Sequence, residues 1–177
     1  MRIIAGEFRS RRLKSLPGDA TRPTSDRLRE TIFDILQTRI EGAVFVDAYA
    51  GTGAVGIEAL SRGARHVFFL EKNRAALDAI RENLASLKAE RRATVYAGAV
   101  LVTLARCRTA DIVFLDPPYD QEREYAAALE LLGADPPALV IAQHAFRFKL
   151  GDTYGGLART RVLKQGDNAL SFYSPGK

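Results

Sequence analysis

The chain has 177 residues, 47% hydrophobic and 27% charged, which is typical of one globular domain with a sizeable core. It contains no run of about 18 apolar residues, which excludes a membrane span, and its start lacks the apolar core of a signal peptide, so we expect a cytoplasmic protein. The single Cys107 excludes an internal disulfide, and the distant His66 and His144 give no zinc-ligand spacing, so we expect no metal.

The net charge of +5 is unevenly distributed along the chain. Residues 1–14 and 144–177 each carry +4, which leaves −3 for residues 15–143. Positive charge at both ends of the chain favours a polyanionic partner, most simply nucleic acid. A solvated basic surface would give the same pattern. The candidates for phosphate contacts near the start are Arg9, Arg11, Arg12 and Lys14.

We expect a single domain over 1–177, with a basic extension at 1–20 and a core at 21–177. In the extension, residues 2–5 and 11–16 could pair as a small β-hairpin. A helix is predicted over 25–40, with Ser25 as its N-cap. One face of this helix carries Leu28, Ile32, Ile35 and Leu36.

Apolar strands then alternate with amphipathic helices. We predict strands at 43–48, 66–71, 93–97 and 111–116, and helices that run to about residue 62, from 74 to 88 and near 100–106. This alternation indicates a parallel sheet covered on both faces. A fifth strand at 138–143 is followed by strands at 157–164 and 169–174, which the turn QGDN joins as an antiparallel pair.

The first strand leads into GTGAVG at 51–56, which fits the pattern G-x-G-x-x-G. Glycines let the backbone approach a ligand, and Glu71, at the end of the second strand, could bind ribose hydroxyls. The same features describe an NAD site, so they indicate only a nucleotide-type cofactor.

The carboxylate of Asp47 distinguishes the two cofactors by charge. It would oppose the pyrophosphate of a dinucleotide, whereas S-adenosyl-L-methionine brings a positive α-amino group and a positive sulfonium. A capping role for Asp47 in the turn is the alternative. Charge therefore favours the methyl donor.

The fourth strand ends in the sequence DIVFLDPPY, which packing alone does not explain, because two prolines cannot continue a central strand. An exocyclic amine on a base is a poor nucleophile, since its lone pair is delocalised into the ring. Asp116 and the carbonyl of Pro117 could accept its two hydrogens, and Tyr119 could stack on the base. The target base must be unpaired or flipped out of a duplex.

With these motifs placed, the chain resembles the bacterial RsmD family, which methylates guanine N2 in 16S ribosomal RNA. The resemblance is carried by GEFRSRRL at 6–13, RPTSDRLRE at 22–30, DAYAGTG at 47–53, EALSRGA at 58–64 and LDPPY at 115–119. It implies a Rossmann-like class I methyltransferase fold, with a mostly parallel seven-stranded sheet, an antiparallel last strand and an N-terminal hairpin extension that helps to hold RNA. It also implies a monomer whose substrate is 16S rRNA in a partly assembled small ribosomal subunit.

The resemblance also implies roles for individual residues. The catalytic motif corresponds to Asp116, Pro117, Pro118 and Tyr119. The residues expected to bind S-adenosyl-L-methionine are Asp47, Ala50, Gly51, Thr52, Gly53, Glu71, Lys72, Gly98, Ala99, Arg22 and Thr24. The family commonly ends its third strand in Asp or Asn to read adenine, and this chain has Gly98 and Ala99 there, so backbone groups would have to do so. Gln143 stands where glutamate is usual.

Two other functions remain open. An adenine-N6 methyltransferase acting on RNA or DNA would use the same chemistry, although DNA-acting relatives usually add a recognition domain for which 177 residues leave no room. A non-methylating, NAD-type nucleotide-binding module would give Asp116 no role.

Overall fold

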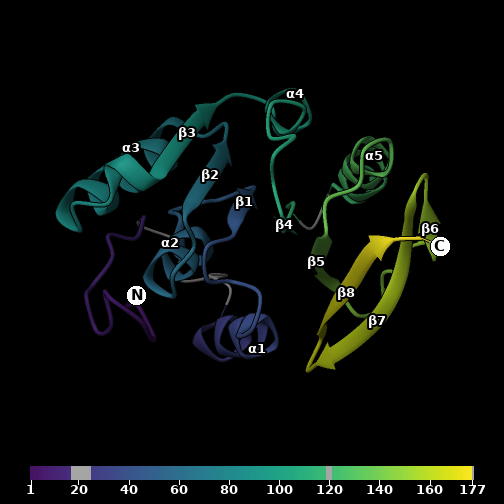
Figure 1. The fold of residues 1–177 in the computed structure, drawn as a ribbon, viewed down its shortest axis with the longest axis horizontal. Coiled ribbons are helices and arrows are strands. Elements are labelled where there is room, and N and C mark those ends of the chain that lie inside the picture. The colour runs from purple at the N-terminus through teal and green to yellow at the C-terminus, as the bar shows by residue number, and fades with distance from the viewer. Residues whose placement is uncertain (17–24, 119–120, 177) are drawn as a thin grey trace.

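The computed structural model describes residues 1–16, 25–118 and 121–176. In this part of the chain one sheet has the strand order β3-β2-β1-β4-β5-β8-β7-β6 (Figure 1). The strands are β1 (Val44–Ala48), β2 (His66–Glu71), β3 (Ala93–Ala97), β4 (Ile112–Leu115), β5 (Leu139–Ala145), β6 (Thr153–Tyr154), β7 (Leu157–Gln165) and β8 (Asn168–Pro175).

The first five strands are parallel, and β8 pairs antiparallel with both β5 and β7. This confirms the predicted class I methyltransferase arrangement with its antiparallel last strand. The sheet has eight strands rather than the predicted seven, because β6 turns back on β7 with Tyr154 opposite Leu157. A strand of two residues has no alternation that a sequence pattern could reveal.

The helices are α1 (Asp26–Leu36), α2 (Ala54–Ser61), α3 (Arg74–Ser86), α4 (Val100–Leu104) and α5 (Glu122–Gly133), with a 3-10 turn, η2, at Glu90–Arg92. The hydroxyl of Ser25 accepts the N–H of Leu28, which confirms the predicted N-cap. α1 ends four residues earlier than predicted, where the N–H groups of Arg39 and Ile40 both turn back to the carbonyl of Leu36. α5 was not predicted from the sequence.

Helices cover both faces of the sheet, as continuous apolar strands require. Alternate side chains such as Phe45, Phe114 and Ile141 join a core with α1, α2 and α3. Their neighbours, such as Val46 and Val113, join a second core with α4 and α5. The hairpin of β7 and β8 lies across the molecule from α3 (Figure 1). In the described part of the chain, none of the helices combines the length and apolarity that crossing a membrane requires.

The N-terminal extension is less regular than the predicted hairpin. Residues 2–5 and 11–16 meet in a single antiparallel bridge, Arg2 to Arg12, rather than in two paired strands. Backbone N–H groups of the extension find their hydrogen-bond acceptor on α2 instead. The Glu58 carboxylate accepts the N–H groups of Ile4 and Ala5. The extension is therefore docked on the core, and its shape follows from α2.

Candidate cofactor and catalytic site

Three carboxylates meet at the carboxyl edge of the sheet. Glu71 is the last residue of β2, Asp47 is the last but one of β1, and Asp116 follows β4. Side chains alternate along a strand, so Asp47, Glu71 and Asp116 project from the same face as Phe45, Phe69 and Phe114. Open α/β sheets bind ligands at this edge. Within the described residues no group of His, Cys, Asp and Glu is placed to hold a metal ion.

The glycine turn connects β1 to α2. Gly51 and Gly53 have φ of +55° and +85°, which other residues adopt at a cost, and Gly53 is the N-cap of α2. A Cβ on Gly56 would lie 2.4 Å from Cε1 of Phe69, so only glycine lets the helix approach β2 this closely. The turn therefore has the geometry that the G-x-G-x-x-G pattern predicts.

Neighbouring elements fix the turn in place. The N–H of Ala50 donates to the carbonyl of Leu70, and the N–H of Gly53 donates to the carbonyl of Ala50. The carbonyl of the buried Thr52 accepts from the amide of Asn83 on α3, with 3.2 Å between nitrogen and oxygen. The backbone that would face a ligand is thus held in one conformation before any ligand binds.

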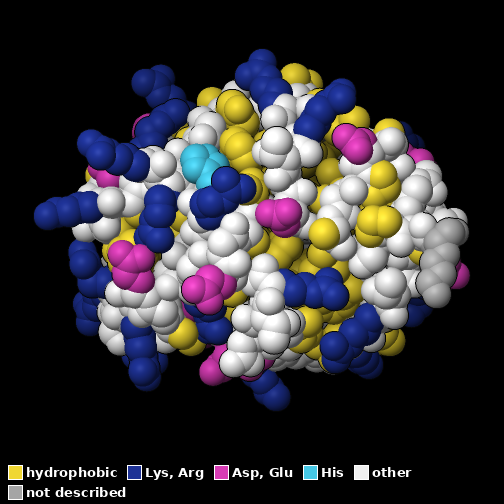
Figure 2. Space-filling view, in the orientation of Figure 1, with side chains coloured by type: hydrophobic (Ala, Val, Ile, Leu, Met, Phe, Trp, Pro, Cys, Tyr) yellow, Lys and Arg dark blue, Asp and Glu magenta, His cyan; other side chains and the backbone are white. Residues whose placement is uncertain are grey.

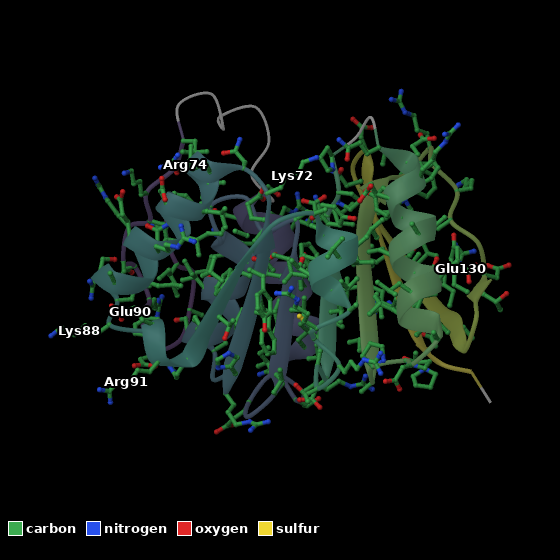
Figure 3. The ribbon with its side chains drawn as sticks, turned by 90° about the horizontal axis from the view of Figure 1, so that it is seen from above. Lys72, Arg74, Lys88, Glu90, Arg91 and Glu130 are labelled. Atoms are coloured by element: carbon green, nitrogen blue, oxygen red, sulfur yellow. The ribbon has the colours of Figure 1, made fainter. Side chains whose placement is uncertain are left out.

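Glu71 links the turn to the end of β2. Its Oε2 accepts the N–H of Gly51 at 2.8 Å, and its Oε1 accepts the N–H groups of Lys72 at 2.8 Å and Asn73 at 2.9 Å. Glu71 is half-buried, and Lys72 is exposed at the same end of the sheet (Figure 3). The carboxylate therefore lies beside the glycine turn, as its proposed contact with ribose requires.

Asp47 is buried, and its Oδ2 accepts the N–H of Gly56 at 2.7 Å. This is the capping contact that the sequence left open, made to the first turn of α2 from across the glycine loop. Burial raises the pKa of Asp47 well above its usual range, the N–H of Gly56 lowers it, and the charges of Asp116 and Glu71 raise it. A cation bound at this edge would stabilise the carboxylate.

The chain leaves β4 through Asp116, Pro117 and Pro118. Asp116 is half-buried, Pro117 is buried and Pro118 is exposed. The carbonyl of Pro118 accepts the N–H of Gln121, the N-cap of α5, at 2.9 Å. β4 ends before the two prolines, as the sequence predicts, at the edge that also carries Asp47 and Glu71.

The third strand ends beside β2. The N–H of Gly98 donates to the carbonyl of Glu71 at 3.0 Å, and Gly98 has φ of +142°. The exposed Ala99 is the N-cap of α4. Both residues therefore lie at the carboxyl edge with the glycine turn and offer backbone groups there.

The four basic residues proposed for RNA lie along α3, and Lys14 comes closest to the glycine turn, because Asn83 bonds both its backbone and the carbonyl of Thr52. A nitrogen of Arg11 donates to the carbonyl of Ser86 at the end of α3, and the ammonium of Lys14 pairs with Glu82 at 2.6 Å. Arg9 and Arg12 are exposed on the same segment. Figure 2 shows many Lys and Arg side chains at the side of the molecule where α3 lies in Figure 1. The extension thus carries its charge on the α2 and α3 side of the protein.

Three expected site residues, Arg22, Thr24 and Tyr119, lie outside the described residues. Tyr49 and Asn83 were not predicted as site residues, although Asn83 bonds the glycine turn and Tyr49 bonds α5. Tyr49 has φ of +63° and donates its hydroxyl to Glu124 on α5 at 2.7 Å. An aromatic residue just before a glycine turn is the only signal for Tyr49, and Asn83 has none beyond a polar position on an amphipathic helix.

Comparisons with known proteins show which family this sequence and fold belong to. The family model described as conserved hypothetical protein 95 matches residues 1–174. YlbH of Bacillus subtilis is 34% identical over 181 residues, which cover 98% of each chain. Ribosomal RNA small subunit methyltransferase D of Escherichia coli is 40% identical over 119 residues, which cover 67% of this chain and 60% of that protein. The solved structure of yhhF from Escherichia coli has a TM-score of 0.87 at 30% identity, covering 99% of this chain and 97% of that one.

Proposed function

The chain belongs to the RsmD family, and from this membership and its site we propose that it transfers a methyl group from S-adenosyl-L-methionine to the exocyclic N2 amine of a guanine in 16S ribosomal RNA. The observation that carries the proposal is the meeting of Asp47, Glu71 and Asp116 beside a glycine turn at one sheet edge. A relative named ribosomal RNA small subunit methyltransferase D supports the RNA substrate.

The residues at this edge fit the methyl donor. Asp47 and Glu71 supply negative charge, which suits an α-amino group and a sulfonium and would oppose a pyrophosphate. Glu71 would accept from the ribose hydroxyls, with Ala50, Gly51, Thr52, Gly53 and Lys72 around it and with Gly98 and Ala99 offering backbone groups to adenine. We include Arg22 and Thr24 in the proposed donor site because of the family resemblance alone.

Our mechanism assigns the acceptor to the segment after β4. Asp116 and the carbonyl of Pro117 accept the two N–H hydrogens of the amine and direct its lone pair toward the methyl group. Pro118 keeps the exit rigid, and Tyr119 stacks on the base. When bound, the donor supplies the electrophilic carbon. A nitrogen–carbon bond forms as the carbon–sulfur bond breaks, and the amine's proton passes to Asp116 or to water.

The protein's partner in this proposal is 16S rRNA in a partly assembled small subunit, bound by one protomer in the cytoplasm. Arg9, Arg11, Arg12 and Lys14 would contact phosphates that extend beyond the catalytic edge. Because the extension docks on α2 and α3, these contacts would lie on the donor side of the protein.

Two measurements test the proposal. Calorimetric titration should show binding of S-adenosylhomocysteine in preference to NADH, and the opposite preference would refute the methyl donor. Mass spectrometry of ribosomal RNA from a deletion strain should show the loss of one N2-methylguanosine, restored by the wild-type gene. Loss of N6-methyladenosine instead would establish the alternative acceptor.

A further inference from the structure

We propose that a pocket at the carboxyl edge of β5 and β7 binds a phosphodiester group of the substrate RNA close to the methylated nucleotide, with Lys149 and Lys164 as its ligands. The inference rests on the proposed function and adds a second RNA contact on the side of the catalytic segment away from the donor.

The pocket has a volume of about 610 Å³, which lies within the range of about 300–1,000 Å³ that small-molecule sites span. Three segments form it: the end of β5 with the loop after it, the end of β7, and the turn into β8. Its lining residues are Ala145, Phe146, Arg147, Lys164, Gly166, Asp167 and Asn168.

Two ammonium groups converge on one aromatic ring at this pocket. The Nζ atoms of Lys149 and Lys164 lie 4.3 Å and 4.2 Å from the ring centroid of Phe146. The backbone of Phe146 is fixed to the turn before β8, because its N–H donates to the carbonyl of Asp167 at 2.8 Å. Both lysines are exposed, so an anion that enters the pocket can reach their positive charge.

The charges around the pocket are mostly positive. The exposed Arg147 and Lys164 line the pocket, and Lys149 lies over the ring of Phe146. Asp167 supplies one carboxylate. A phosphodiester is the anion that such a site would meet on an RNA, and each phosphate neutralised by lysine or arginine contributes to affinity. The pocket therefore has the charge that an RNA phosphate requires and ample room for it.

The strand register places the pocket beside the catalytic segment. Leu115 of β4 pairs with Ala142 of β5, so Asp116 lies level with Gln143, and Ala145 follows two residues later, about 7 Å along the strand. Asn168 pairs with Ala145, and Gln165 of β7 pairs with Asn168. The pocket is thus one to three strand spacings of about 5 Å from β4.

The donor site occupies the opposite side of β4. Asp47, the glycine turn and Glu71 belong to β1, β2 and the loop between them, and β4 lies between these strands and β5. A base held at Asp116 must therefore approach from the β5 side. The phosphates next to that base would pass over the pocket.

The test is to replace Lys149 and Lys164 together by glutamine and to measure methylation of small-subunit RNA from cells that lack the enzyme. The matched control is Lys88→Gln with Arg91→Gln, which removes the same charge at the amino edge of the sheet (Figure 3). We expect the pocket variant to lower kcat/KM for RNA by about tenfold or more and to reduce the salt slope of RNA binding by about one or more. Its affinity for S-adenosylhomocysteine should match that of wild type.

Arginine at both positions should restore activity, because it keeps the charge. Equal effects of the pocket variant and the control would overturn the phosphate site and leave the methyltransferase intact. A wild-type protein that bound no S-adenosylhomocysteine would instead refute the proposed function. In another outcome, inorganic phosphate binds the wild-type protein saturably and perturbs the ring resonances of Phe146 while the pocket variant keeps its RNA affinity. That result would identify a small-anion site and would also overturn the inference.

Discussion

Tyr49, in the loop after β1, donates its hydroxyl to the carboxylate of Glu124 on α5, with 2.7 Å between the two oxygens. The bond joins the cofactor loop to the helix that follows the Asp-Pro-Pro segment. Burial, and then the bonded and charged Glu124, raise the pKa of Tyr49, so the phenol stays protonated and remains the donor. The loop after β1 and the helix after the Asp-Pro-Pro segment are therefore coupled through these two side chains.

Tyr49→Phe tests this coupling. Removing a hydrogen bond to a carboxylate from a half-buried site should lower the free energy of unfolding by about 1–2 kcal/mol. We expect kcat to fall several-fold while the KM for the donor changes little, because the glycine turn keeps its own bonds to Leu70 and Glu71. Glu124→Gln retains an acceptor and should keep most of the activity. Equal losses in kcat and in donor affinity would show a merely structural role.

Asp116→Ala should separate donor binding from chemistry. The variant removes an acceptor for the hydrogens of the amine, so we expect methyl transfer to fall by about 10² to 10³. Binding of S-adenosylhomocysteine, measured by calorimetry, should stay within a few-fold of wild type, because Asp47 and Glu71 remain. Undiminished turnover by Asp116→Ala would refute the assigned role.

The raised pKa of Asp47 makes donor binding depend on pH. A bound cation favours the carboxylate, so donor binding should release a proton while the pH lies below the pKa of Asp47 in the free protein. Affinity for S-adenosyl-L-methionine should therefore rise with pH and level off above that pKa. Asp47→Asn keeps an oxygen for the N–H of Gly56 and should bind the donor more weakly and with a flat pH profile.

The same shift predicts how stability depends on pH. The pKa of Asp47 is higher in the folded protein than the value of about 3.9 in an unfolded chain. Protonation therefore favours the folded state, and this stability is lost as pH rises from about 4 through the folded-state pKa. Denaturant unfolding should show less of this loss in Asp47→Asn. An identical pH dependence in the two proteins would contradict the shift.

The parallel strands of this fold could be predicted because most of them are continuous apolar runs. β2 and β3 have the predicted bounds, and the other parallel strands differ by one or two residues. The helix α5 was not predicted, although its buried face carries Tyr125, Leu129 and Leu132 at helical spacing. The local apolar pattern was sufficient to predict the strands of the sheet. The Asp-Pro-Pro motif identified the edge of the sheet where the candidate site lies.

The bond of Asp47 to Gly56, nine residues away, is the capping contact that the sequence left open. Other contacts at the site could not be predicted, because they join residues far apart in the chain, as Tyr49 and Glu124 do. A fully buried glutamate at position 58 is unexpected on any helix. Besides Arg62, four residues away, its partners are backbone groups more than 50 residues away, which no pattern around Glu58 could reveal.

Glu58→Ala should release the N-terminal extension from the core. The carboxylate is the acceptor for the N–H groups of Ile4 and Ala5, at 2.9 Å and 3.0 Å, and for Nε of Arg62 at 2.8 Å. Leaving these donors without it should lower the free energy of unfolding by about 2–4 kcal/mol. Hydrogen exchange at Ile4 and Ala5 should accelerate far more than exchange in β1 or β4.

Glu90→Ala is the matched control, because Glu90 is an exposed glutamate on η2 (Figure 3), and it should change neither quantity. If the extension helps to hold RNA, Glu58→Ala should also weaken RNA binding while leaving affinity for S-adenosylhomocysteine close to that of wild type. Protected amides at Ile4 and Ala5 in Glu58→Ala would show that other contacts, such as Ser61 Oγ with the N–H of Phe8, suffice to dock the extension.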